Sequence, residues 1–204
     1  MFFTFEGPEG CGKSTHAAKL KEYLEGKGHQ VILTHEPGGT PLGKQIRELL
    51  LHSKSEPNEI TELYCFAADR AEHVAKVIAK ALAEKKIVIS DRFTDSTLAY
   101  QIGGRGLPED LVRYINMISA RGLDPDLTLL LDVSPEVGLK RAGQVGDLDR
   151  FEQEKLEFHK RVRGKYLEIA KNNPGRVKVI NTEKMQIAEA QIKIRKVVDE
   201  KLRN

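Results

Sequence analysis

The chain has 204 residues, enough for one domain with a sizeable core, and 40% of them are hydrophobic. Lys and Arg total 33 against 30 Asp and Glu, so the net charge of +3 is too balanced to indicate a nucleic-acid-binding surface. The sequence has no apolar stretch long enough to span a membrane, no signal-peptide pattern and only two cysteines, so we expect a soluble, cytoplasmic protein without disulfides that binds neither nucleic acid nor membrane.

Strand and helix patterns alternate along the whole chain. Apolar runs predict strands at 2–6, 31–35, 87–91, 127–132 and 177–180. Helices are expected at 13–26, 41–52, 57–84, 94–102, 108–121, 135–142, 151–172 and 184–202. Ser134-Pro135 is typical of a helix start, and Gly28 and Gly122 stand where helices should end. Strands without polar alternation are typical of a parallel sheet covered on both faces. We therefore predict one three-layer α/β domain over 1–204.

A phosphate-binding pattern follows the first strand. Residues 6–15 read EGPEGCGKST, and residues 7–14 match GxxxxGK[ST] between an expected strand and an expected helix. In such a loop, backbone N–H groups and the helix N-terminus face phosphate oxygens. We expect Lys13 to contact the β- and γ-phosphates and the Ser14 hydroxyl to bind Mg²⁺. The alternative is a Gly-rich turn that merely contains a lysine, and the strand–loop–helix context disfavours it.

The predicted triphosphate site consists of Gly7, Pro8, Glu9, Gly10, Cys11, Gly12, Lys13, Ser14 and Thr15. We interpret Cys11 as a tolerated small residue, although neighbouring amides are expected to lower the pKa of its thiol.

A phosphate loop also needs an acid that holds Mg²⁺ and its waters, at the end of a neighbouring strand. Asp91 and Asp132 both end apolar strands. Asp91 is favoured because Arg92 follows it, which places an acid for the metal and a guanidinium for a phosphate at one strand end. The alternative role for Asp132 is to cap the next helix.

The helix expected at 57–84 presents two faces. Its spacing predicts an apolar stripe toward the core, formed by Ile60, Leu63, Ala67, Ala71, Val74, Ile78 and Leu82. Phe66 and Arg70 lie off this stripe and are neighbours, because they are four residues apart. An aromatic ring beside a guanidinium suits a planar base with carbonyl oxygens, and Tyr100 and Gln101 would complete such a pocket. A packing pair or a dimer contact is an equally good interpretation.

Two glycine-rich stretches are expected to be mobile loops. The first is 103–106, and the second is 143–147, which charged residues flank. The second is the better candidate for a lid, placed at about 142–150.

Five motifs together resemble bacterial thymidylate kinases. They are the loop at 6–15, EPGGT at 36–40, DRF at 91–93, STLAYQ at 96–101 and DRFE at 149–152. The resemblance covers essentially the whole chain, in order. It implies the P-loop nucleoside-monophosphate kinase fold, with a five-stranded parallel sheet flanked by helices and a small mobile lid. It also implies phosphorylation of dTMP to dTDP by ATP and Mg²⁺, a step in dTTP biosynthesis, by a homodimer that associates through the 57–84 region.

The resemblance further implies roles for individual residues. Lys13, Asp91 and Arg92 would serve catalysis, with Ser14 and Asp91 as the metal ligands. Phe66 would stack on thymine, Arg70 would donate to a thymine carbonyl, and Arg92 would bind the dTMP phosphate. The dTMP site would consist of Glu9, Glu36, Pro37, Phe66, Arg70, Arg92, Ser96, Thr97, Tyr100, Gln101 and Phe151.

The sequence departs from the family in its arginines. Relatives carry a catalytic arginine beside the acidic residue of the loop or an Arg-x-Arg-x-Arg lid, but here Gly10 follows Glu9 and Arg141 stands alone. We predict that Arg141 or Arg150 takes the role, with Lys140 in reserve, because a missing arginine finger costs about 10³–10⁵ in rate.

Three alternatives remain at this point. One is a kinase of another monophosphate or of a nucleoside, with the same fold. A GTPase-type switch needs a guanine-reading Asn-Lys-x-Asp, which the sequence lacks. The third alternative is a nucleotide-binding scaffold without turnover.

Overall fold

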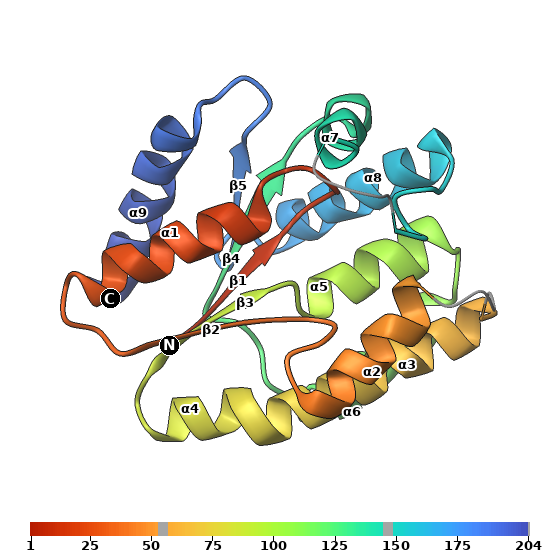
Figure 1. Cartoon of the computed structure of the whole chain (residues 1–204), viewed down its shortest axis with the longest axis horizontal. Coiled ribbons are helices and arrows are strands. Elements are labelled where there is room, and N and C mark those ends of the chain that lie inside the picture. The colour runs from red at the N-terminus through yellow and green to blue at the C-terminus, as the bar shows by residue number, and fades with distance from the viewer. Residues whose placement is uncertain (53–56, 145–148, 204) are drawn as a thin grey trace.

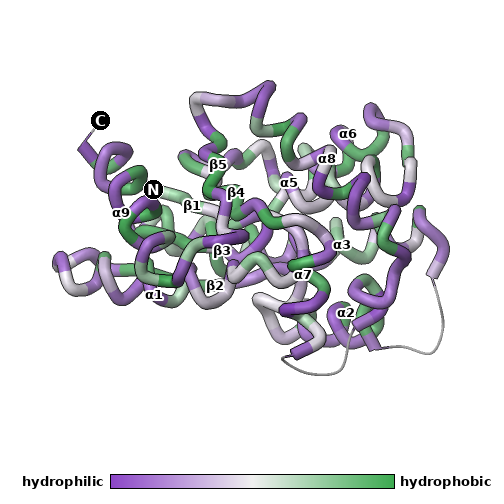
Figure 2. The backbone as a smooth tube through the Cα atoms, turned by 90° about the horizontal axis from the view of Figure 1, so that it is seen from above, coloured by the Kyte–Doolittle hydropathy of each residue, from purple (hydrophilic) through white to green (hydrophobic). Residues whose placement is uncertain are grey.

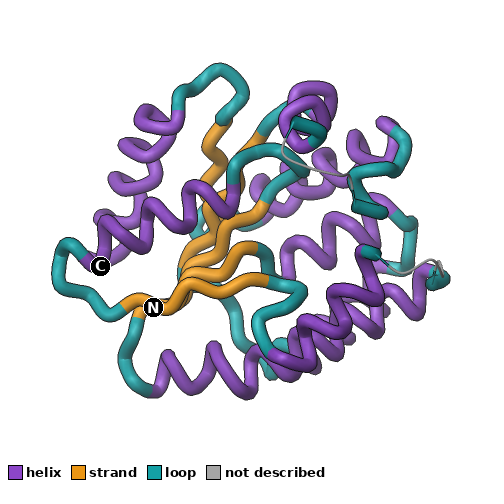
Figure 3. The backbone as a smooth tube through the Cα atoms, viewed as in Figure 1, coloured by secondary structure: helices purple, strands orange, loops and turns teal. Residues whose placement is uncertain are grey.

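A five-stranded parallel sheet forms the centre of the protein, as the computed structural model shows for residues 1–52, 57–144 and 149–203 (Figures 1 and 3). The strands are β1 (Phe2–Glu6), β2 (Val31–His35), β3 (Ile87–Asp91), β4 (Leu127–Asp132) and β5 (Val177–Asn181). Their order is β2-β3-β1-β4-β5, and every pair is parallel. The predicted strands and the parallel sheet are confirmed.

The helices follow the predicted order, with shifted boundaries. They are α1 (Lys13–Glu25), α2 (Pro41–Leu51), α3 (Glu59–His73), α4 (Ala79–Ala83), α5 (Thr94–Thr97), α6 (Glu109–Ser119), α7 (Pro135–Ala142), α8 (Leu156–Asn172) and α9 (Ile187–Arg203). Two π-helical segments, η1 (Val74–Ile78) and η2 (Leu98–Gly104), continue α3 and α5. The helix expected from 151 begins at Leu156, because the Asp149 carboxylate accepts the N–H groups of Phe151 and Glu152 and holds a turn there. None of the helices in the described ranges is long and apolar enough to cross a membrane.

Helices cover both faces of the sheet, as the three-layer prediction requires. On one face, α1 and α9 pack on the strands around Phe3, Leu20 and Ile194. These two helices alternate hydrophobic and hydrophilic residues along their length (Figure 2). On the other face, α4 packs on β3 and α8 packs on β4 and β5. The carboxyl ends of the strands remain available for a site.

The predicted apolar stripe on helix 57–84 is wrong in part. Leu63, Val74 and Ile78 are buried, but Ile60 and Ala71 are exposed. The buried side of α3 carries charged and polar side chains instead, namely Glu62, Asp69, Arg70 and His73. Burial of such groups requires partners, and these come from other elements of the chain.

The loop expected at 103–106 is also wrong in part. Gly103 and Gly104 belong to η2 and pack against α8, where a Cβ on Gly104 would lie 2.5 Å from the Phe158 ring. Arg105 follows and forms ion pairs with Glu62 and Glu154. Residues 145–148 of the expected lid lie outside the described residues.

Candidate active site

A cavity of about 550 Å³ opens at the carboxyl ends of the strands. Many of the predicted site residues line it, namely Glu9, Gly10, Gly12, Lys13, Ser14, Thr15, Glu36, Pro37, Phe66, Arg70, Asp91, Arg92, Ser96, Thr97, Tyr100, Gln101 and Phe151. Six further residues line it that the predicted sites did not name, His35, Arg47, Leu51, Ala142, Asp149 and Glu152. Ala142 and Asp149 belong to the expected lid, and Asp149 and Glu152 belong to the DRFE motif. The position of His35 at the end of β2 was a usable signal, whereas Arg47 reaches the Pro37 carbonyl from α2, a contact that no local pattern indicates.

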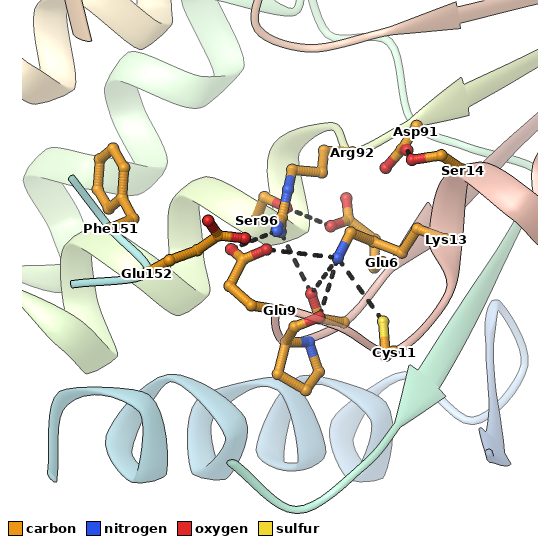
Figure 4. Close-up of polar contacts among 12 residues, drawn as sticks. Glu6, Glu9, Cys11, Lys13, Ser14, Asp91, Arg92, Ser96, Phe151 and Glu152 are labelled. Atoms are coloured by element: carbon orange, nitrogen blue, oxygen red, sulfur yellow. Dashed lines mark hydrogen bonds and ion pairs between the residues drawn. The ribbon is translucent and has the colours of Figure 1, made fainter. Parts of the chain in front are cut away.

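The loop between β1 and α1 curls around its own lysine. Lys13 Nζ donates to the carbonyl oxygens of Gly7 (3.2 Å) and Pro8 (2.9 Å) and lies 3.6 Å from Cys11 Sγ (Figure 4). Burial raises the pKa of the Cys11 thiol, so the expectation of a lowered pKa is wrong.

The phosphate loop packs closely against α7. Gly10 has φ +64°, and a Cβ there would lie 2.0 Å from the carbonyl oxygen of Gly138. A Cβ on Gly138 would lie 2.3 Å from the carbonyl oxygen of Glu9. Only glycine fits this contact, which explains why no arginine follows Glu9 in this chain.

Two oxygen-bearing side chains meet at the start of α1. The Ser14 hydroxyl donates to Asp91 Oδ2 at 2.5 Å, across the ends of β1 and β3 (Figure 4). Such a pair fits a Mg²⁺ ion that keeps waters and phosphate oxygens as its other ligands. The described residues contain no cluster of three or more His, Cys, Asp or Glu that would hold a metal alone. Asp132 is instead paired with Arg163 at 2.7 and 2.9 Å, and the N-cap residue of α7 is Ser134, so the alternative role of Asp132 as the helix cap is wrong.

Arg92 lies at the centre of the site. Its backbone has φ +73°, a conformation that costs energy for a residue with a side chain and is typical of functional positions. The guanidinium donates to Glu9 Oε1 at 2.6 Å and lies 5.1 Å from the Tyr100 ring centre. Burial raises the pKa of Glu9, but Arg92 and Lys13 outweigh it and lower the value to about 2. Glu152 extends toward this pair from the segment after the expected lid (Figure 4).

A buried carboxyl group, Glu6, lies next to Arg92, and both side chains contact the Ser96 hydroxyl. Glu6 accepts the N–H of Phe93 (2.7 Å) and the hydroxyl of Ser96 (2.5 Å), and Ser96 Oγ lies 3.2 Å from Arg92 Nη1. Burial and the neighbouring Asp95 raise the pKa of Glu6 to about 8. The sequence analysis did not name Glu6 as a site residue. A charged residue at the end of an otherwise apolar strand was the pattern that could have indicated it.

The other side of the cavity is aromatic. Phe66, Tyr100 and Phe151 form one cluster, with the Phe151 ring centre 5.8 Å from each of the other two. Arg70 lies beside them, only 2% exposed. Its nitrogens already have protein acceptors within 3.0 Å, on Glu36, Thr97, Asn116 and the Phe93 carbonyl.

The two arginines predicted for the catalytic role do not line the cavity, and they contact different parts of the chain. Arg141 donates to the carbonyl oxygens of Thr182 and Glu183. Arg150 donates to Glu62 and to the Leu50 carbonyl and stacks on Phe151. The Thr182 hydroxyl in turn donates to the Cys11 carbonyl, so Arg141 is the arginine on the phosphate-loop side.

Comparison with known proteins decides between the alternatives at family level. The thymidylate kinase family model matches residues 5–194. The chain belongs to the thymidylate kinase family. Among curated family members, the thymidylate kinase of Synechococcus sp. (strain JA-2-3B'a(2-13)) is 52% identical over 90% of this chain and 87% of its own. That of Pseudomonas syringae pv. tomato is 46% identical over 99% and 96%.

The fold of the family is confirmed by a solved structure. The crystal structure of thymidylate kinase from Ehrlichia chaffeensis superposes with a TM-score of 0.81, at 37% identity, and covers 98% of both chains. The parallel sheet flanked by helices is therefore the family's P-loop fold.

Proposed function

We propose that this family member transfers the terminal phosphoryl group of ATP to dTMP, which yields ADP and dTDP. The main support is that one cavity joins a phosphate loop to an arginine and an aromatic pocket. A triphosphate on the loop and a nucleoside monophosphate on Arg92 would then face each other across it. A GTPase-type switch or a scaffold would need only the triphosphate side of this cavity, and not the side formed by Arg92 and the aromatic residues.

On the donor side, residues 7–15 would hold ATP through backbone N–H groups, with Lys13 released from the Gly7 and Pro8 carbonyls onto phosphate oxygens. Ser14 and Asp91 would hold Mg²⁺, which supplies charge neutralisation at the phosphates when bound.

On the acceptor side, Arg92 would bind the dTMP phosphate, and Glu9 would lie near the sugar. Phe66 and Phe151 would enclose the base, as their ring distance supports. The remaining contacts would come from Glu36, Pro37, Arg70, Ser96, Thr97, Tyr100 and Gln101, which line the same cavity. All three nitrogens of Arg70 already donate to protein acceptors. Arg70 would therefore donate to a base carbonyl through a bifurcated hydrogen bond, in which one N–H faces two acceptors.

The transfer itself would be in line and without a covalent intermediate. The acceptor is a phosphate oxygen that is already ionised, so no general base is required. Exclusion of water from the cavity would protect ATP from hydrolysis during the transfer.

Of the two arginines, we propose Arg141 for the charge on the transferred phosphoryl group. Its contacts with Thr182 and Glu183 place it on the phosphate-loop side, whereas Arg150 is bound to Glu62 on the base side.

We also propose a homodimer through α2, α3 and α6. Large apolar side chains are exposed on these three helices, at Leu42, Leu49, Ile60, Tyr64, Tyr114, Met117 and Ile118. The helices lie together at one side of the molecule (Figure 1), and exposed apolar surface of this kind is typical of an interface. The cytoplasm is our proposed compartment, because both cysteines are free thiols.

The variant Lys13→Ala tests the donor half of the proposal. It should abolish dTDP formation while the far-UV circular dichroism spectrum stays that of the parent. Full turnover by the variant would contradict the role of the loop. If the variant loses the circular dichroism spectrum of the folded protein, binding of ATP to the parent is measured instead.

A further inference from the structure

We propose that Glu62 is a positioning residue that orients the side-chain amide of Gln101 and thereby sets which base the cavity accepts. The inference rests on the proposed function, because it concerns the base of the monophosphate acceptor. Glu62 does not line the cavity and belongs to none of the five motifs. Its side chain is 1% exposed on α3, one turn before Phe66.

Four N–H groups converge on the Glu62 carboxylate. Oε1 accepts from Gln101 Nε2 at 2.8 Å and from Arg105 Nε at 3.1 Å. Oε2 accepts from Arg105 Nη2 at 3.0 Å and from Arg150 Nη2 at 2.6 Å. Two guanidinium groups therefore balance one buried carboxylate, and the remaining donor is the amide of Gln101.

The chemistry of this contact determines which way Gln101 faces. A carboxylate accepts hydrogen bonds and has no proton to donate, so the Gln101 NH₂ group must point at Glu62. The amide oxygen is then the polar atom that Gln101, a residue of the cavity lining, offers to a ligand. An oxygen at this place accepts from an N–H of the base. Thymine carries such a donor at N3, whereas cytosine carries an acceptor there.

Arg70 has little capacity to adjust to a different base. Its Nη1 donates to Thr97 and Asn116, and its Nε and Nη2 both lie 2.8 Å from Glu36 Oε2. A fixed donor at Arg70 and a fixed acceptor at Gln101 match the O4 and N3–H edge of thymine. The same two groups meet the N4–H and N3 edge of cytosine with donor against donor and acceptor against acceptor.

Glu62 also anchors the chain that covers the base. The Arg105 guanidinium lies 5.4 Å and the Arg150 guanidinium 4.5 Å from the centre of the Phe151 ring. The same carboxylate therefore holds the two cations that face Phe151 and the amide that reads the base edge. Orientation of the amide and placement of the aromatic cover depend on one side chain.

The variant Glu62→Gln tests the proposal with dTMP and 5-methyl-dCMP, which differ at positions 3 and 4 of the base. The new amide presents either an oxygen or an NH₂ group to Gln101, so Gln101 is free to turn. We expect the ratio of kcat/KM for dTMP over 5-methyl-dCMP to fall about tenfold or more, chiefly through KM. An unchanged ratio, with both substrates affected equally, would overturn the proposal.

Two further variants make the outcome independent of folding. Gln101→Met removes the amide and should lower the same ratio, and adding Glu62→Gln to it should lower the ratio no further. A Gln101→Met enzyme with the parent ratio would refute the role of the oriented amide, even if Glu62→Gln fails to fold. The matched control is Glu154→Gln, which removes the other carboxylate partner of Arg105 and should leave the ratio at the parent value. A parent that phosphorylates neither substrate contradicts the proposed function, whereas an active parent with an insensitive ratio contradicts this inference alone.

Discussion

Replacement of Gly10 by alanine should destabilise the fold more than its half-buried position in a loop suggests. The backbone at Gly10 has φ +64°, which costs about 1–2 kcal/mol for a residue with a Cβ. The added Cβ would lie 2.0 Å from the Gly138 carbonyl oxygen, so the loop and α7 must separate, at a further cost of about 1–3 kcal/mol. The free energy of unfolding should therefore fall by about 2–5 kcal/mol, which lowers Tm by roughly 4–20 °C for a chain of this size.

Gly122→Ala provides the matched control. Its φ is +70°, and a Cβ there meets no atom within 4 Å, so only the backbone cost applies. Urea denaturation of both variants, followed by circular dichroism, isolates the contact between the loop and α7 as the difference between them. Gly138→Ala tests the same contact from the helix side, where the backbone cost is absent. Equal destabilisation by Gly10→Ala and Gly122→Ala would refute the close approach as the reason for glycine in the loop.

Three further predictions concern the lid arginines, a buried acid and the exposed helices. Arg141→Ala should lower kcat by about 10³-fold or more, and Arg150→Ala should chiefly raise KM for dTMP; parent values for both in steady-state assays would remove these assignments. Burial, followed by the charge of Glu36, raises the pKa of Asp69 to about 6 from 3.8. The folded protein therefore retains a proton that the unfolded chain has lost, and stability that is present below pH 4 is lost as the pH rises through 6. About two pKa units correspond to about 3 kcal/mol, so urea titrations from pH 4 to 8 should show a smaller decline for Asp69→Asn than for the parent, whereas the decline due to the raised pKa of Glu6 stays in both. An equal decline in both proteins would contradict the assignment. Tyr64 is 57% exposed, so light scattering should give the mass of a dimer for the parent and of one chain for Tyr64→Glu; a parent with the mass of one chain would contradict the proposed interface.

Local sequence patterns were sufficient for the sheet and for half of the site. Strands β1, β3 and β4 are short apolar runs buried on both faces, and the edge strands β2 and β5 are short runs that are partly exposed. The local sequence locates all five within a residue. The phosphate loop is equally local, because its glycines, Lys13 and Ser14 act within one turn of chain. Asp91 and Arg92 could be predicted for the same reason, because they are neighbours at the end of one strand.

The buried charged residues could not be predicted from the sequence, because their partners lie far away along the chain. Glu62 pairs with residues 39 to 88 positions distant, and Glu6 with Tyr166 across 160. The spacing of apolar residues predicts that Ile60 faces the core, but Ile60 is exposed. The charged side of α3 is buried instead, because the partners of Glu62 lie on that side. Tertiary pairing therefore overrode the hydrophobic period on this helix.

The most direct test is product analysis with Mg²⁺-ATP and a panel of dTMP, dUMP, AMP, GMP and CMP. If the cavity joins a triphosphate to a thymidine monophosphate, dTMP should give the highest kcat/KM, with one dTDP formed for each ADP. Preference for another monophosphate, or ADP released without dTDP, would contradict the proposed function.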